Sequence, residues 1–191
     1  MTNSYPLVSI IMNCFNGDKY LKEAVESIIQ QSYKNWELIF WDNQSNDKSS
    51  EIIKSFRDER IKYFYSDNFT DLGGARAKAC KYVEGEYLAI LDTDDIWFPN
   101  KLKNQLNYFS DPEVGICLSN TIFFNNKKKN SLYYKNPPVG SVTKKLIENY
   151  YISLEATLLK INFIKKLDIF FDKRFSHIAD FDLITRLSTI C

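Results

Sequence analysis

Three aspartates stand within four residues of one another, directly after an apolar run. They are Asp92, Asp94 and Asp95. Carboxylates this close repel one another, and folding tolerates them poorly unless a cation neutralises them. Their hard oxygens suit Mg²⁺ or Mn²⁺, ions that keep water ligands and bind phosphate groups. The cluster therefore predicts a site for a metal and a diphosphate. The simpler alternative is that Asp94 or Asp95 caps a helix near Pro99.

Further polar or aromatic side chains follow two earlier apolar runs. They are Asn13, Phe15, Asn16, Asp42 and Asn43. In an open parallel sheet, ligands bind beyond the carboxyl ends of the strands, so residues far apart in the sequence meet at one edge. We therefore expect these five residues and the three aspartates to line one cleft.

The elements that must position these residues alternate in type. Strand-like runs are predicted at 7–12, 36–41, 61–65, 87–91 and 114–118. Four helical patterns lie between or after them: one begins at 18, a second ends at about 56, a third covers 73–83, and a fourth begins at 99. This alternation predicts an α/β fold with a mostly parallel central sheet flanked by helices. It ends after Asn120, where 122–124, 127–130 and 132–134 predict a hairpin with a basic tip. A last helix is expected over 180–190.

Composition limits the possible functions. The chain has 191 residues, of which 45% are hydrophobic and 26% charged, as expected for a globular domain. The net charge of +1 gives no general attraction to nucleic acid. Four scattered cysteines, no leader and no apolar span predict a reduced, cytoplasmic protein. Because the chain stops at Cys191 inside an amphipathic pattern, we also expect a domain that is incomplete at its C-terminus.

Glycine-rich phosphate motifs are absent from the sequence. The pattern GxxxxGK[ST] does not occur, and the turn at 13–17 reads NCFNG where a dinucleotide fold would have GxGxxG. A bound nucleotide would therefore be held by side chains and by the metal.

The order and spacing of several motifs resemble the family 2 glycosyltransferases, which have the GT-A fold. The matching segments are 6–16 (first strand and nucleotide loop), 31–39, 42–47 (the DDxSxD loop), 74–76, 85–87, 91–95 (the DXD motif), and Trp97, Pro99, Lys101 and Leu102. The resemblance runs over essentially the whole chain. It implies transfer of a sugar from a nucleotide diphosphate donor, such as a UDP-sugar, to an acceptor hydroxyl with inversion. It also implies Mn²⁺ or Mg²⁺ as a cofactor.

The resemblance assigns roles to individual residues. It places Asn13, Phe15, Asn16, Asp42 and Asn43 around the base and ribose, with Phe15 stacking on the base. Arg76 would lie near the base or diphosphate, Asp92, Thr93 and Asp94 would contact the nucleotide-sugar, and Asp94 or Asp95 would bind the metal. Asp180 matches the family's catalytic base. Two positions depart from the pattern: Asn43 replaces the second aspartate of its loop, and Ala179 replaces the acid before the base.

We expect one domain over 1–191, with a nucleotide-sugar-binding half (1–120) and an incomplete acceptor-side half (121–191). The implied acceptor is a glycan or lipid-linked saccharide, as in polysaccharide biosynthesis, which allows peripheral association with the inner face of a membrane. Two alternatives remain. One is a non-catalytic domain that binds a sugar nucleotide. The other is a nucleotidyltransferase, although that class has a glycine-rich loop with a basic residue after its first strand.

Three other features have ordinary structural interpretations. His177, the one histidine, is predicted to be structural or solvated, with acceptor contact as the alternative. Asp182 and Arg186 have the spacing of an ion pair within a helix. The lysines at 127–129 predict a solvated loop or, alternatively, a surface that attracts an anionic acceptor or headgroups.

Overall fold

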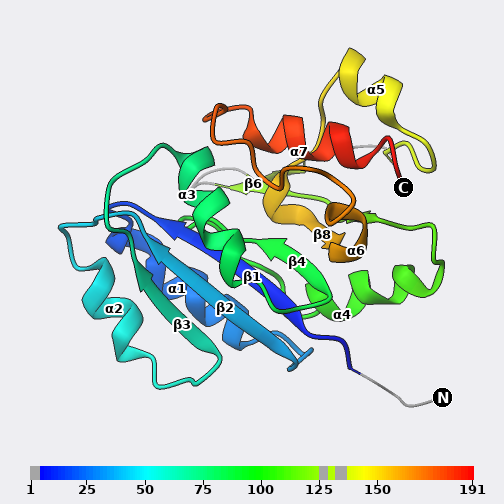
Figure 1. Ribbon diagram of the computed structural model, residues 1–191. Helices are drawn as coiled ribbons and strands as arrows, with labels where there is room; N and C mark the ends of the chain where they lie inside the picture. Colours follow the sequence, from blue (N-terminus) through cyan, green and yellow to red (C-terminus); the bar gives the residue numbers. More distant parts are fainter. Residues whose placement is uncertain (1–4, 125–128, 132–136) are drawn as a thin grey trace.

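A central sheet organises the computed structural model, which describes residues 5–124, 129–131 and 137–191. Within these ranges, six strands form the sheet in the order β3-β2-β1-β4-β8-β5. The strands are β1 (Val8–Cys14), β2 (Trp36–Asp42), β3 (Ile61–Tyr65), β4 (Tyr87–Ile90), β5 (Ile116–Leu118) and β8 (Thr157–Lys160). Figure 1 shows that helices cover both faces of this sheet.

The helices divide between the two faces. Those packed on one face are α1 (Asp18–Ile29), α2 (Ser49–Ser55) and α4 (Lys101–Leu106). Those packed on the other are α3 (Leu72–Ala79), α6 (Ile161–Ile164) and α7 (Ala179–Leu187), with α5 (Thr143–Glu148) against α7. The sheet is therefore the middle layer of three.

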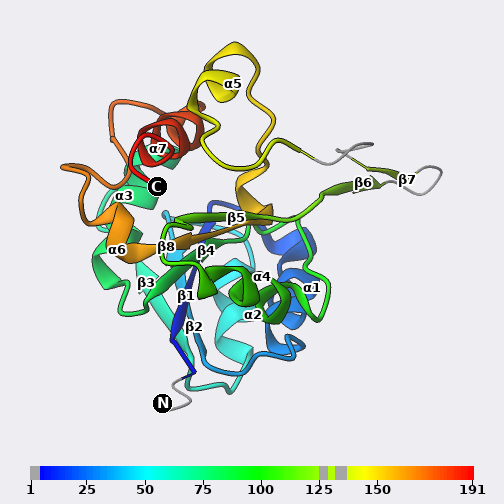
Figure 2. The same ribbon diagram turned by 90° about the vertical axis from the view of Figure 1, so that its right-hand side faces the viewer.

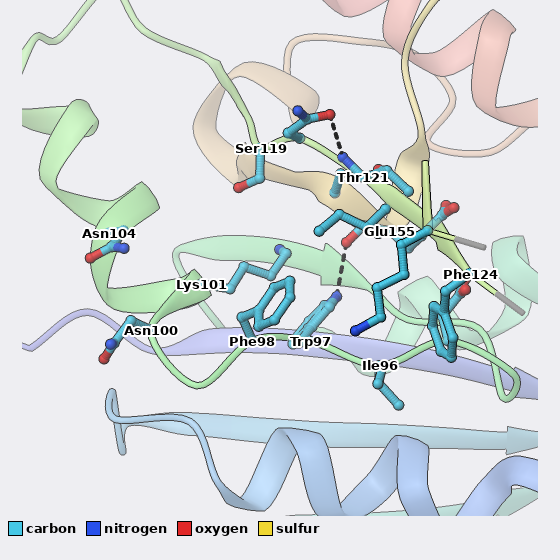
Figure 3. A pocket seen from close by; sticks show the side chains of 15 residues that line it. Ile96, Trp97, Phe98, Asn100, Lys101, Asn104, Ser119, Thr121, Phe124 and Glu155 are labelled. Carbon is cyan, nitrogen blue, oxygen red and sulfur yellow. Dashed lines mark hydrogen bonds between the residues drawn. The ribbon is translucent and has the colours of Figure 1, made fainter. Parts of the chain in front are cut away.

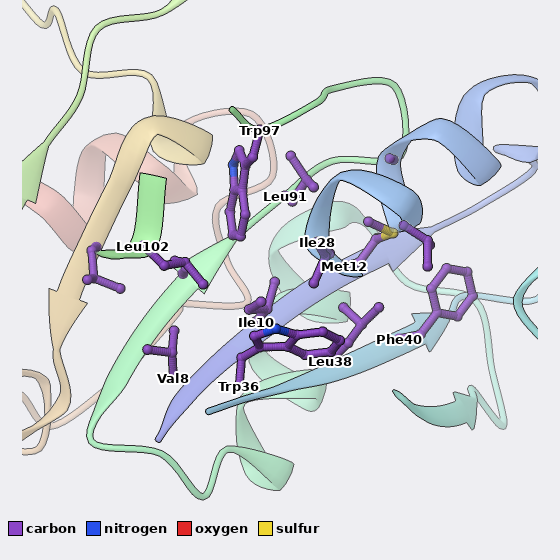
Figure 4. Packing of buried hydrophobic residues seen from close by; sticks show 14 of the residues in the cluster. Val8, Ile10, Met12, Ile28, Trp36, Leu38, Phe40, Leu91, Trp97 and Leu102 are labelled. Carbon is purple, nitrogen blue, oxygen red and sulfur yellow. The ribbon is translucent and has the colours of Figure 1, made fainter. Parts of the chain in front are cut away.

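Burial on both faces explains why the first strands are continuous apolar runs. Successive side chains of a strand point to opposite faces. Ile10 and Met12 accordingly pack in the core that contains Trp36, as Figure 4 shows, whereas Ile11 packs with Trp41 in the core beneath α3 and α7. Every residue of β1 and β2 is buried.

The structure confirms the expected fold class but changes the sheet beyond β4. The alternation of strands and helices favours a fifth parallel strand at 114–118. The strand β5 runs in that direction but is shorter, and it does not pair with β4: β8 lies between β4 and β5 and pairs antiparallel with both. A late strand from 157–160 thus joins a sheet built by the first 120 residues, so the two predicted halves of the chain share one sheet.

Other element boundaries differ by a few residues. Helix α3 ends at Ala79 and continues as a single 3-10 turn over Cys80–Tyr82, and α7 covers 179–187 where 180–190 is expected. The hairpin forms from β6 (Ile122–Phe124) and β7 (Lys129–Ser131), and Figure 2 shows it extending away from the sheet. The predicted strand at 132–134 lies outside the described residues, as do the lysines at 127 and 128. Among the described residues, no helix is long and apolar enough to cross a membrane.

Candidate active site

The carboxyl ends of β1, β2 and β4 lie side by side. The backbone NH of Asn43 donates to the Cys14 carbonyl (2.8 Å), and that of Leu91 donates to Ile11 (3.0 Å). Beyond the strands, Thr93 packs against Gly17 so closely that a β-carbon on Gly17 would lie 2.7 Å from the threonine Oγ1. The loops that follow β1, β2 and β4 therefore form one edge of the molecule, as the parallel arrangement requires.

The antiparallel strand β8 brings a further carboxylate to this edge. Leu88 of β4 pairs with Leu159 of β8, and continuing that register by four residues places Asp92 opposite Glu155. One carboxylate oxygen each of Asp92, Asp95 and Glu155 lies within 4.8 Å of the others. Glu155 was not found by the sequence analysis, because only the direction of β8 reveals that it faces the aspartates.

Burial and crowding raise the pKa of two of these carboxylates, Asp95 and Asp92. Burial and the charges of Glu155, Asp94 and Asp92 raise the pKa of Asp95 to about 7. The pKa of Asp92 is also raised, mainly by burial, and Arg76 opposes that shift. Such crowding is relieved when a cation binds. Three hard oxygen donors are the ligand type that Mg²⁺ and Mn²⁺ prefer, so the residues present fit such an ion.

The composition of this group differs from the expected metal ligands. Asp94 is exposed and is not part of the group, whereas Asp95 is in it. The alternative that one of these aspartates caps α4 finds no support, because Asn100 is the N-cap residue and makes no side-chain capping bond.

Arg76 links α3 to the aspartates. Its guanidinium lies 3.2 Å from Asp92 Oδ1, and its side chain is almost fully buried. The Nε of Arg76 and both amide atoms of Asn13 are buried without hydrogen-bond partners among the described residues. An unsatisfied buried group costs about 1–3 kcal/mol. This part of the edge therefore has hydrogen-bonding capacity that the described chain does not use.

Asp42 and Asn43 are buried and hold loops in place. Asp42 accepts hydrogen bonds from the Ser45 NH (2.7 Å) and the Tyr63 hydroxyl (2.8 Å), and its side chain has no exposed surface. Burial and the bond to Asp42 raise the pKa of Tyr63. Asn43 donates through Nδ2 to the Thr70 carbonyl (2.7 Å). Both residues are therefore positioned to shape the loops at this edge rather than to project from them.

Asp180 lies in the first turn of α7, beside the start of α3. A β-carbon on Gly73 would lie 1.8 Å from the Phe175 carbonyl oxygen and 3.5 Å from Ala179 Cβ, so the two helix starts are in direct contact. Figure 1 shows both at the same end of the molecule. Asp180 is partly exposed and has no hydrogen bond or ion pair among the described residues.

The neighbouring acid of α7 is already engaged. The Asp182 carboxylate pairs with Arg186 (2.6 Å), as the spacing predicts, and the same guanidinium bonds the carbonyls of Ile169 and Phe170. His177 is exposed. Of the charged residues at 177–186, Asp180 is the one carboxylate without a structural partner among the described residues.

A cavity of about 410 Å³ adjoins the carboxylates on the side of α4 and β6 (Figure 3). Asp95 and Glu155 line it, together with the rings of Phe98 and Phe124. Trp97 donates from its indole NH to the Glu155 carbonyl (2.9 Å). This bond fixes the backbone that carries the Glu155 carboxylate.

Lys101 lines the same cavity and is buried. It donates to the Thr157 carbonyl (3.0 Å) and to Gln105 Oε1 (2.8 Å), and its Nζ lies 4.1 Å from the centre of the Trp97 ring. Burial lowers the pKa of Lys101 to about 7, although the Glu155 carboxylate opposes the shift. Lys101 is therefore a buried base that is only partly charged at neutral pH.

Replacing Lys101 by methionine is expected to change how stability depends on pH. The folded state of the wild type binds the lysine proton less tightly than the unfolded state, whose lysine pKa is about 10.4. The free-energy cost of burying a charged lysine is therefore complete below pH 7. The free energy of unfolding rises as the pH increases from about 7 toward 10, because the folded state has already lost the proton. Lys101→Met should remove this rise, as urea unfolding at several pH values would show. The exposed Lys103→Met on the same helix is the control, and a Lys101→Met profile parallel to the wild type would contradict the expectation.

The comparisons with known proteins agree with this geometry. The model of the family described as "Glycosyl transferase family 2" matches residues 9–176. The chain therefore belongs to that family. Its fold is the GT-A fold: the model superposes on S. aureus TarS 1–349 in complex with UDP with a TM-score of 0.78, at 21% identity, over 95% of this chain and 53% of that one. The mannosyltransferase PcManGT from Pyrobaculum calidifontis, in complex with GDP-Man and Mn²⁺, gives 0.73 at 17% identity, over 97% and 52%.

One relative by sequence is WfgD of Escherichia coli, a UDP-Glc:alpha-D-GlcNAc-diphosphoundecaprenol beta-1,3-glucosyltransferase. It is 36% identical over 114 residues, which are 60% of this chain and 45% of that protein. The match thus covers less than half the length of this relative.

Proposed function

We propose that this protein transfers a sugar from a UDP-sugar, with inversion, to a hydroxyl of a glycan or lipid-linked saccharide, assisted by Mn²⁺ or Mg²⁺. The observation that carries the proposal is the meeting of Asp92, Asp95 and Glu155 at the edge where the nucleotide loops also end. A diphosphate is the substrate group whose charge such an ion-binding edge can accept.

In this proposal the donor lies along the edge formed by the carboxyl ends of β1, β2 and β4. The base lies beside Phe15, and the loops held by Asp42 and Asn43 surround it. Asn13, on the side of the base and ribose, and Arg76, near the base or diphosphate, have hydrogen-bonding atoms without partners among the described residues. Thr93, which packs on Gly17, joins the base side to the carboxylate side.

The residues that would hold the metal are Asp95 and Glu155, with Asp92 shared with Arg76. When bound, the ion would supply positive charge that stabilises the diphosphate as it leaves. Arg76, buried beside Asp92, would add a fixed positive charge on the same side.

Asp180 would act as the general base. Inversion needs one carboxylate, which removes the proton from the acceptor hydroxyl as that oxygen attacks the anomeric carbon from the face opposite the diphosphate. A partly exposed carboxylate at the start of α7, without a partner in the part of the chain that the structure describes, suits this role.

The acceptor would approach from the side of α7 and β6. A lipid-linked saccharide is supported by the name of the relative WfgD, whose acceptor is a diphosphoundecaprenol. Exposed Lys129 at the start of β7 would attract the phosphate of such an acceptor or the headgroups of its membrane.

Calorimetric titration with UDP, with and without Mn²⁺, tests the donor site. We expect the wild type to bind UDP and Mn²⁺ to strengthen the binding. Asp94→Ala should reduce the gain in UDP affinity that Mn²⁺ brings by about tenfold at most, because Asp94 is exposed and lies outside the group formed by Asp92, Asp95 and Glu155. The exposed Asp168→Ala is the control. Equal UDP binding with and without Mn²⁺ in the wild type would contradict the metal's role.

A further inference from the structure

Two phenyl rings lie exposed and in contact above the nucleotide loops. Phe15 follows β1, and Phe69 lies in the loop between β3 and α3. Their centres are 4.7 Å apart with 60° between the ring planes, and the side chains are 52% and 54% exposed. The sequence analysis selected Phe15 alone. Two rings in contact yet open to water form an angled apolar surface.

The backbone that carries Phe69 is fixed on both sides of the ring. Lys78 donates to Asn68 Oδ1 (2.7 Å) and to the Asn68 carbonyl (3.2 Å). On the other side, Asn43 donates to the Thr70 carbonyl (2.7 Å). The exposure of Phe69 is therefore built into an ordered loop.

The backbone that carries Phe15 is fixed in the same way. The Cys14 carbonyl accepts from the Asn43 NH (2.8 Å). Asn16 has a positive φ of 54° and donates from its backbone to Ser45 Oγ (3.0 Å). Its side-chain oxygen accepts from the backbone NH of Asn46 (2.8 Å). Asn43 thus contributes to both loops, and it sets the position of one ring relative to the other.

The position of the pair matches one part of a nucleotide donor. Phe15 lies two residues before Gly17, which touches Thr93 of the aspartate loop. The rings are therefore at the β1–β3 side of the edge and the carboxylates at the β4–β8 side. A nucleoside diphosphate has the same order of parts, with a flat aromatic base at one end and charged phosphates at the other.

We infer that Phe69 is a second base-binding residue, whose ring extends the angled apolar surface of Phe15 on which the nucleobase of the donor stacks. This inference rests on the proposed function and extends it. A base stacked on an aromatic side chain contributes about 1–3 kcal/mol, and every base has a face that can stack. Because the two loops are already ordered, little conformational entropy is lost when the base binds.

Phe69→Ala tests the inference through the difference between two ligands. We expect its affinity for UDP in the presence of Mn²⁺ to fall by about 5- to 150-fold, which is the stacking contribution expressed as a ratio. Its affinity for Mn²⁺-pyrophosphate, which has no base, should not change. Phe69→Tyr keeps the ring and should retain UDP binding, whereas a merely structural role would weaken both ligands together.

Phe123→Ala removes a ring of β6 that is equally exposed (58%) and is the matched control. If the wild type binds UDP and Phe69→Ala binds it equally well, the inference is wrong and the proposed function stands. If the wild type binds neither UDP nor pyrophosphate, the proposed function fails and the inference fails with it. Melting temperatures verify that each variant is folded.

Discussion

Asp180→Asn is expected to reduce sugar transfer by about 10²- to 10⁴-fold while leaving UDP binding unchanged. An amide of the same shape cannot take the proton of the acceptor hydroxyl, and general-base catalysis contributes a factor of that size. The donor site is built from other elements, so its affinity should not depend on this carboxylate. Transfer from a UDP-sugar to a saccharide acceptor measures the first effect, and calorimetry with UDP measures the second.

The neighbouring carboxylate of α7 supplies the matched control. Asp182→Asn removes the ion pair with Arg186, so it should lower stability by about 1 kcal/mol or less and leave transfer intact. If Asp180→Asn retained the wild-type rate, the base would have to be another residue. If both variants lost UDP binding, α7 would be a structural support of the donor site instead.

The double variant Asp95→Asn/Glu155→Gln is expected to shift stability in opposite directions with and without metal. Without a divalent ion, the variant should melt at a higher temperature than the wild type, because two crowded carboxylates no longer repel each other. With Mn²⁺ at about 100 times its dissociation constant, the wild type should gain about 2.7 kcal/mol. For a domain of this size that gain is roughly 5–10 °C, and the variant should show none of it.

Thermal unfolding with and without Mn²⁺ measures both effects without needing an acceptor. The control is Glu23→Gln/Asp168→Asn, which makes the same change of net charge at two exposed positions. An equal Mn²⁺ shift in the wild type and the Asp95/Glu155 variant would exclude this group as the metal ligands. Comparison with Asp94→Ala would then show whether the ion depends on exposed Asp94, one of the two metal ligands expected from the sequence.

Much of the donor side could be predicted from local patterns. The apolar runs that become β1 and β2 are buried on both faces, and the polar residues after them mark strand ends. Parallel strands bring such ends together wherever they occur in the sequence. For this reason Asp42, Asp92 and the Phe15 loop could be expected at one edge before any coordinates were considered. The pair Asp182–Arg186 was predictable because helical spacing alone brings the two residues together.

Other features depend on contacts between distant segments. Glu155 faces Asp92 only because β8 runs antiparallel beside β4, and a four-residue strand has no pattern that reveals its direction. In the sequence, nothing distinguishes Phe69 from other loop residues. It lies against Phe15 because hydrogen bonds from Asn43 and Lys78 hold its loop in place.

The amino-acid sequence by itself determined the family, the alternation of strands and helices, and the types of residue that meet at the edge of the sheet, because these depend on periodicity and on motifs of short range. Only the tertiary structure decided which carboxylates form a group, that Asp42 is turned inward, and that Asp180 has no partner within 5–124, 129–131 and 137–191. Distances between side chains depend on strand order, strand direction and packing, and these are properties of the whole folded chain.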